Sequence, residues 1–166
     1  MSEFEKQPPR TRLERLVSAL SIRTTTIKSA GGGGKPALES CHYAGMLAGM
    51  KGDPWLVRTA EHLLLHVYLR EPDHRRPLSK ALFLHLANRV LVQHPDLQTS
   101  GKELREIVDL TIAAAAAGGR VTYSDAERHG IKRKRWDRLR PVYHLALDRI
   151  IEAENALIEH LSRDCT

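Results

Sequence analysis

The chain has 166 residues, of which 42% are hydrophobic and 5% aromatic, and a formal net charge of +6. This length suffices for one or two folded units, and the low aromatic content argues against a stacking surface for single-stranded nucleic acid. The cysteines Cys41 and Cys165 are too few for a disulfide framework, and no apolar run predicts a signal peptide or membrane span. We therefore expect a cytoplasmic protein with no membrane partner, and the positive charge favours a polyanionic one.

Residues 1–36 are predicted to form a mobile N-terminal segment that contains a short helix and a glycine-rich linker. The apolar residues of that helix share one face: Leu13, Leu16, Val17 and Leu20. Thr24–Thr26 and Gly31–Gly34 interrupt the pattern, and consecutive glycines lose much backbone entropy on ordering. The glycines lack the preceding strand and the spacing of a phosphate-binding loop, so a linker is the preferred interpretation.

Residues 37–119 are predicted to form a helical core, because apolar residues recur every three to four positions there and no segment alternates as a strand does. A first helix is expected over 36–50. Asp53 should cap the next helix, with Pro54 at its first position. That helix should run to Leu69 and, being apolar on most sides, should be central.

Two more helices are expected in this core. Pro77 should start one of them and Pro95 should end it. Its residues in apolar register are Leu78, Ala81, Leu82, Leu86, Val90 and Leu91. Ser100 and Glu103 have capping-box spacing before the other helix, which should stop at Gly118. The predicted fold class is all-α, with a helical bundle core, a C-terminal helix-turn-helix and a long final helix.

Residues 120–166 are predicted to form the helix-turn-helix and the final helix. From Arg120 to Arg140 there are eight Lys or Arg against three Asp or Glu, so the positive charge is concentrated there. Ser124 and Glu127 have the spacing of a second capping box, which predicts a short helix beginning near the following residue. Gly130 should then supply a left-handed turn before a basic helix.

Small and apolar residues of this stretch are spaced as the inward side of two angled helices requires. They are Ala126, Ile131, Trp136 and Leu139. Asp125, where an apolar residue is more usual, and His129, just before the turn, depart from the general pattern. Pro141 is expected to open the final helix, whose apolar stripe either braces the motif, the preferred interpretation, or presents a partner surface.

The outward face of the basic helix is predicted to bind double-stranded DNA. Its candidate base-reading residues are Lys132, Arg133, Lys134, Asp137 and Arg138. Lys and Arg can bind guanine edges in the major groove, and Asp137 can accept from cytosine or orient a neighbouring arginine. The candidate phosphate contacts are Arg128, Arg135 and Arg140. The alternative is a solvated basic face without a ligand.

Other chemistry finds little support in the sequence. His62 and His66 are spaced to share a helix face, as zinc ligands do, but the further candidates Cys41, His42 and His74 have no recognised ligand spacing. Cys41 and His42 are adjacent and would point apart on a helix, unlike a nucleophile and its base. We predict no metal, no cofactor and no enzymatic activity.

The segments Val121–Ala126, His129–Arg133 and Trp136–Pro141, followed by a long helix, resemble the small Q-type antitermination regulators. These proteins occur in lambdoid and related phages and as phage-derived regulators of bacterial lysis, and the resemblance is clearest over the last quarter of the chain. It implies binding to a DNA element beside the target promoter, contact with RNA polymerase and sigma factor at an early pause, and read-through of later terminators. It assigns the five base-reading positions above but no polymerase-contacting residue, and the chain lacks the cysteine-rich zinc finger of some larger Q proteins.

The function predicted from the sequence is therefore a sequence-specific DNA-binding antitermination factor. Two alternatives remain at this stage. One is a helix-turn-helix repressor or activator that acts only at initiation. The other is a helical adaptor whose basic helix binds an acidic protein.

Overall fold

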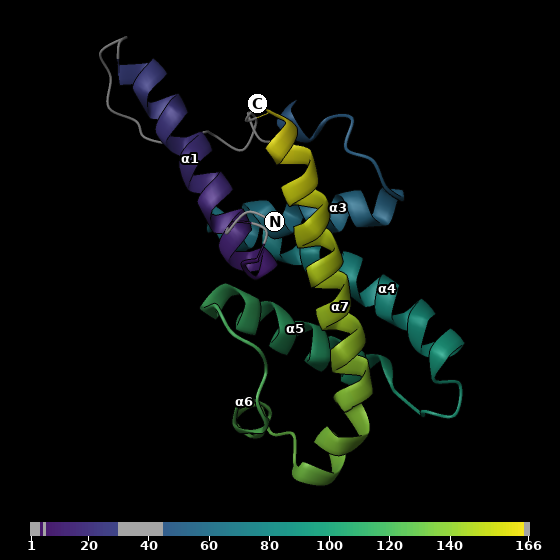
Figure 1. Cartoon of the computed structure of the whole chain (residues 1–166). Helices are drawn as coiled ribbons and strands as arrows, with labels where there is room; N and C mark the ends of the chain where they lie inside the picture. Colours follow the sequence, from purple (N-terminus) through teal and green to yellow (C-terminus); the bar gives the residue numbers. More distant parts are fainter. Residues whose placement is uncertain (1–3, 5, 30–44, 165–166) are drawn as a thin grey trace. The chain divides into compact units, whose positions relative to one another are not determined.

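The computed structural model describes residues 4, 6–29 and 45–164, with the backbone alone over 21–29. All regular secondary structure in these residues is helical, which confirms the all-α class (Figure 1). The predicted linker Gly31–Gly34 and most of the helix expected over 36–50 lie outside the described residues. The chain divides into two compact units, one of residues 1–61 and 151–166 and one of 62–150, and these bounds differ from the segments predicted above.

The first unit contains α1 (Pro9–Ser29), whose predicted apolar face is buried at Leu13, Leu16, Val17 and Leu20. The prediction of a short helix is wrong, because α1 continues for 21 residues through the three threonines. β-branched residues lower helix propensity only slightly, so they do not end a helix that is already nucleated. The end of α7 (Arg133–Asp164) adds further buried residues to this unit: Ala153, Leu157, Ile158 and Leu161.

Helix α3 (Pro54–Leu63) begins as predicted, with Asp53 Oδ1 accepting a 2.9 Å hydrogen bond from the Leu56 amide. It continues into a wide turn, η1 (Leu64–Tyr68), in which Leu64 and Leu65 are buried beside Leu63. Three consecutive side chains spread over about 200° around a helix axis, so all three are buried only where neighbours surround the helix. The C-terminal part of this segment is therefore surrounded on most sides, as its apolar sequence predicts.

The second unit continues with η2 (Pro72–His74), α4 (Arg75–Gln93) and α5 (Gly101–Ala117). Helix α4 begins two residues before Pro77, because a proline in the first turn loses no intrahelical hydrogen bond. Helix α5 has the predicted Ser100–Glu103 capping box and ends at Gly118, whose φ is 89°. Leu91 of α4, predicted in the apolar register, is instead 75% exposed.

The last two helices are α6 (Tyr123–Arg128) and α7 (Arg133–Asp164). The prediction that Pro141 opens a separate final helix is wrong, because Pro141 lies inside the continuous 32-residue α7. A proline at 141 leaves only the Asp137 carbonyl without its intrahelical donor. Asp137 is exposed, so water can satisfy that carbonyl, while buried Leu139, Val142 and Tyr143 hold the helix on its other side.

Candidate nucleic-acid interface

Helix α6 starts with a capping box, but at a different residue from the one predicted. Thr122, not Ser124, is the N-cap: its hydroxyl accepts from the Asp125 amide at 3.3 Å, and Asp125 Oδ2 accepts from the Thr122 amide at 2.8 Å. Hydrogen bonds from the Thr122 amide and hydroxyl, and the charges of Arg128 and His129, lower the pKa of Asp125. Asp125, which departs from the usual motif pattern, is therefore the capping partner of the helix.

The turn after α6 is closed by backbone hydrogen bonds around Gly130, whose φ is +80°. The Ile131 amide donates to the Ala126 carbonyl at 2.9 Å, and the Gly130 amide donates to the Glu127 carbonyl at 2.9 Å. This pair of bonds is typical of a helix that ends in a left-handed glycine. His129 places Nδ1 2.9 Å from the Asp125 carbonyl, so it too has a local role at this helix end.

The inward side of this stretch is packed as the sequence predicts. Ala126, Ile131, Trp136 and Leu139 are all buried. The ring of Trp136 lies 5.7 Å from that of Tyr143, centroid to centroid. The Tyr143 hydroxyl accepts a 2.9 Å hydrogen bond from the buried Val121 amide. This bond connects the loop that precedes α6 to α7. A buried polar contact of this kind fixes one register between the two segments.

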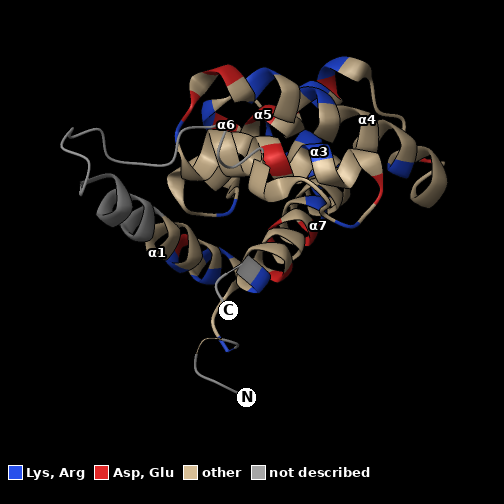
Figure 2. Cartoon of the chain, turned by 90° about the horizontal axis from the view of Figure 1, so that it is seen from above, with Lys and Arg blue, Asp and Glu red and all other residues tan. Residues whose placement is uncertain are grey.

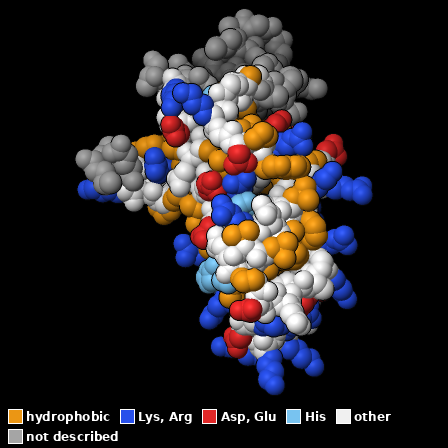
Figure 3. Space-filling model, turned by 90° about the vertical axis from the view of Figure 1, so that its right-hand side faces the viewer, with side chains coloured by type: hydrophobic (Ala, Val, Ile, Leu, Met, Phe, Trp, Pro, Cys, Tyr) orange, Lys and Arg blue, Asp and Glu red, His pale blue; other side chains and the backbone are white. Residues whose placement is uncertain are grey.

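The outward face of α7 near its start consists of residues within about 60° of Asp137 around the helix axis. Five of them are exposed: Arg133, Lys134, Asp137, Arg140 and His144; Pro141, about 40° from Asp137, is half-buried. Lys132, also exposed, precedes the helix and its carbonyl accepts the first helical bond, from Trp136, at 2.9 Å. Figure 3 shows Lys and Arg side chains gathered at the lower end of the molecule, where the turn between α6 and α7 lies in Figure 1.

Arg133 on this face is held by two neighbours. Its Nε lies 3.6 Å from Asp137 Oδ1, and its guanidinium lies 4.8 Å from the centre of the Tyr123 ring. The Arg133 side chain is nevertheless 65% exposed, so its remaining N–H groups face solvent. The pairing favours the interpretation in which Asp137 orients a neighbouring arginine.

Arg135 and Arg138 are placed differently from the expectation, because both turn toward α5. Arg138 forms an ion pair with Glu103, and its Nη1 donates to the Gln98 carbonyl at 2.6 Å. Arg135 pairs with Glu106, and its Nε lies 3.4 Å from Glu103 Oε2. Around the axis Arg138 lies about 100° and Arg135 about 160° from Asp137, outside the outward face. The prediction that Arg138 lies on the outward face of α7 is therefore wrong.

The remaining predicted site residues stay accessible. Arg140 is exposed and shares the outward face with Arg133, although the sequence suggested a phosphate contact at the flank. Arg128 is 78% exposed, with Nη1 3.9 Å from Asp125 Oδ1. His144 was missed by the sequence reasoning. Its position seven residues after Asp137 in an uninterrupted helix would have placed it on this face, but the helix was expected to break at Pro141.

Glu103 connects the candidate interface to α5, and its ionisation should affect stability. Burial by itself raises the pKa of Glu103, but hydrogen bonds from Arg138 and Ser100, and the charges of Arg138 and Arg135, lower it below the ordinary 4.5. A pKa lowered by folding contributes stability above pH 4.5, and that stability is lost as the pH falls through the lowered value.

We therefore expect Glu103→Gln to lower the free energy of unfolding at pH 7, by up to about 1 kcal/mol, the usual range for ion pairs near the surface. Urea unfolding followed by circular dichroism at pH 7 and at pH 3 measures the difference. The gap between wild type and variant should narrow in acid, when Glu103 is protonated in both folded and unfolded chains. A gap that stays constant with pH would contradict the role given to the charge.

His62 of α3 and His66 of η1, spaced in the sequence as zinc ligands on one helix face, each contact a different partner. His62 Nδ1 lies 3.0 Å from His74 Nδ1, and the Nδ1 of His66 lies 3.0 Å from the Glu71 carbonyl. Within the described residues no three His, Cys, Asp or Glu side chains gather as a metal site requires. Cys41 and His42 lie outside the described residues.

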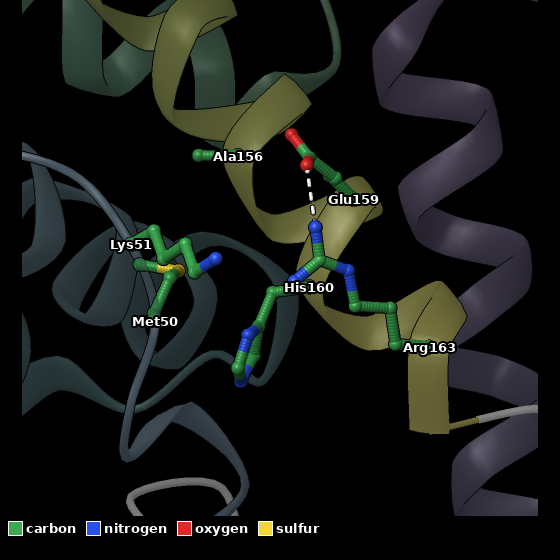
Figure 4. A pocket seen from close by; sticks show the side chains of 6 residues that line it. All are labelled: Met50, Lys51, Ala156, Glu159, His160 and Arg163. Atoms are coloured by element: carbon green, nitrogen blue, oxygen red, sulfur yellow. Dashed lines mark hydrogen bonds and ion pairs between the residues drawn. The ribbon is translucent and has the colours of Figure 1, made fainter.

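A shallow pocket of about 40 Å³ lies in the first unit (Figure 4). Its lining residues are Met50, Lys51, Ala156, Glu159, His160 and Arg163. Arg163 already pairs with Glu159 at 2.8 Å, and His160 Nε2 lies 2.5 Å from the Met46 carbonyl. Small-molecule sites usually enclose about 300 Å³ or more, so the outward face of α7 remains the stronger candidate site.

Comparison with protein-family models, curated proteins and solved structures yields no match to this chain. Among the described residues, no helix has both the length and the apolar character that crossing a bilayer requires.

Proposed function

We propose that the chain is a sequence-specific DNA-binding transcription regulator that inserts the first turns of α7 into the major groove. The observation that supports this most is the exposed cluster Lys132, Arg133 and Lys134 at the N-terminus of α7. Cations there oppose the helix dipole, and the first turn of α7 contains no acidic residue. Phosphates and guanine edges would compensate a charge arrangement that is unfavourable for the helix alone.

In this proposal Arg133 reads a base and Asp137 positions it. An arginine already held by a carboxylate and an aromatic ring loses less side-chain entropy on binding than a free one. Its exposed N–H groups match the O6 and N7 acceptors of guanine. Lys132 and Lys134 lie on either side of Arg133 along the chain and would contact adjacent bases or phosphates.

Phosphate contacts and support would come from the other basic residues. Arg128 at the end of α6 and Arg140 two turns into α7 are exposed and suited to the DNA backbone. Arg135 and Arg138 we assign instead to fixing α7 against α5, through Glu103 and Glu106. This revises the set expected from the sequence, in which both arginines contacted DNA.

We further propose that the DNA-bound chain acts in antitermination in the cytoplasm. The support is the resemblance of the α6–α7 stretch to Q-type regulators, which implies contact with RNA polymerase and sigma factor near a promoter. The same DNA-binding face would also serve a repressor or activator acting at initiation only. An antitermination factor would let RNA polymerase read through a terminator far downstream, whereas an initiation regulator would not.

One experiment separates these functions. It uses a DNA template that carries the region upstream of the gene for this chain, a promoter and a downstream terminator. Footprinting of the stalled promoter complex should show a protected DNA element, and single-round transcription should show increased terminator read-through when the protein is added. Heat-inactivated protein is the control. Protection without read-through would refute antitermination and leave an initiation regulator, while no protection of any duplex would refute the DNA-binding proposal itself.

A further inference from the structure

Helix α4 carries an exposed ridge that turns by about 160° around the helix axis from its first residue to its last. Residues four apart form such a ridge, and here all five are exposed: Arg76, Lys80, Leu84, Asn88 and Val92. Leu91 lies beside the ridge, about 20° from Leu84 around the axis. We call these six residues the α4 ridge. Over 16 residues at 1.5 Å each it is about 24 Å long.

The apolar half of the ridge is unusually accessible. Leu91 and Val92 are 75% and 68% exposed, and Leu84 is 39% exposed. Figure 3 shows the side toward which α4 projects in Figure 1, with hydrophobic side chains at the surface among Lys and Arg. Single exposed leucines are ordinary, but three large exposed apolar side chains along the second half of one helix are typical of an interaction surface.

The other half of the ridge is cationic. Helix α4 has four basic residues, Arg75, Arg76, Lys80 and Arg89, and no Asp or Glu (Figure 2). Within the part of the chain that the structure describes, Arg76 and Lys80 form no ion pair. Two of these cations stand at the N-terminal end of α4, where the helix dipole disfavours them. An acidic partner would remove that unfavourable interaction.

We propose that the α4 ridge docks a protein helix that carries acidic residues toward one end and large apolar residues toward the other. The acidic residues would meet Arg76 and Lys80, and the apolar residues would meet Leu84, Leu91 and Val92. A second copy of this chain does not fit. Parallel α4 helices would oppose like charges, and antiparallel ones would set the cations of one against the leucine and valine of the other.

Nucleic acid fits less well than protein, because the apolar half of the ridge offers nothing to phosphates. The proposal rests on α4 alone and does not depend on DNA binding by α7. It would give the chain a protein-docking surface on a different helix from the candidate DNA-binding face.

The test uses the full chain and three labelled helical peptides of about 18 residues, enough to cover the ridge. The first has Glu residues one turn apart near one end and Leu residues near the other. The second replaces each Glu by Lys, and the third replaces each Leu by Ala. Fluorescence anisotropy should show saturable binding of the first peptide, more than about tenfold tighter than either control.

Variants of the ridge sharpen the test. Leu91→Ser with Val92→Ser should abolish binding of the first peptide, and Arg76→Glu with Lys80→Glu should make the chain prefer the lysine peptide. Arg75→Glu with Arg89→Glu, on the same helix but off the ridge, is the charge-matched control and should keep the original preference. All replaced side chains are exposed, so thermal melts should stay close to wild type.

Three results would overturn the proposal. Equal binding of all three peptides would mean non-specific adhesion. Displacement of the first peptide by duplex DNA, with loss of DNA binding in the Arg76→Glu, Lys80→Glu variant, would assign the ridge to nucleic acid. Concentration-dependent dimerisation in sedimentation experiments that Leu91→Ser abolishes would assign it to a second copy of the chain.

Discussion

Replacing Arg133 and Lys134 together by alanine is expected to weaken binding to the cognate duplex by about 100-fold or more, since each specific base contact is worth about 1–3 kcal/mol. Both side chains are exposed on the outward face of α7, so the loss should arise from DNA contacts and not from unfolding. The slope of log affinity against log salt should also become shallower, by about one for each cation removed. Anisotropy titrations of a labelled duplex at several salt concentrations measure both quantities.

The matched control removes the same charge from α4, at Arg75 and Arg89, which are also exposed. It should change affinity only slightly, because screening confines the effect of a surface charge to roughly 10 Å. Arg138→Ala provides a further comparison, since Arg138 is paired with Glu103. If Arg138→Ala weakened DNA binding more than Arg133→Ala, the assignment of the outward face would be wrong.

Trp136→Ala is expected to lower the free energy of unfolding by about 3–5 kcal/mol, the range for truncating a buried large aromatic. Trp136 is 3% exposed and packs on Tyr143, whose hydroxyl holds the Val121 amide. Helix α6 has six residues and only Ala126 buried, so it cannot remain ordered without this support. Urea unfolding gives the energy, and loss of duplex binding should accompany it.

The chain provides its own control in Trp55, its second tryptophan, which is 43% exposed. Trp55→Ala should cost about 1 kcal/mol or less, because much of that side chain already contacts water. Equal destabilisation by the two substitutions would contradict the place given to Trp136 in the core.

The start of α6 shows where sequence reasoning reaches its limit. Thr122 with Asp125 and Ser124 with Glu127 both have capping-box spacing, and the two registers differ by two residues. The structure uses Thr122, in the register that buries Ala126 and lets the Val121 amide reach Tyr143. That contact joins residues 22 apart in the chain, so local pattern could not select it.

The fold class, the caps at Asp53 and Ser100, and the four inward residues of the α6–α7 stretch were predictable, because each depends on spacing within one or two helical turns. Arg138 and Pro141 were not. The direction of Arg138 depends on Glu103, 35 residues earlier, and the continuity of α7 depends on packing on both sides of the proline. Leu91 was assigned inward by period alone, although a periodic pattern cannot tell where the neighbouring helices end.

Glu103 joins the start of α5 to the first turns of α7, which lie far apart in the sequence. It completes the cap of α5 with Ser100, and it pairs with both Arg135 and Arg138 of α7. Energies of residues that share a partner do not add, so the contribution of Ser100 depends on which residue stands at 138. Substitutions at these positions are therefore epistatic, and a change tolerated at one of them is tolerated only with the right residue at the others.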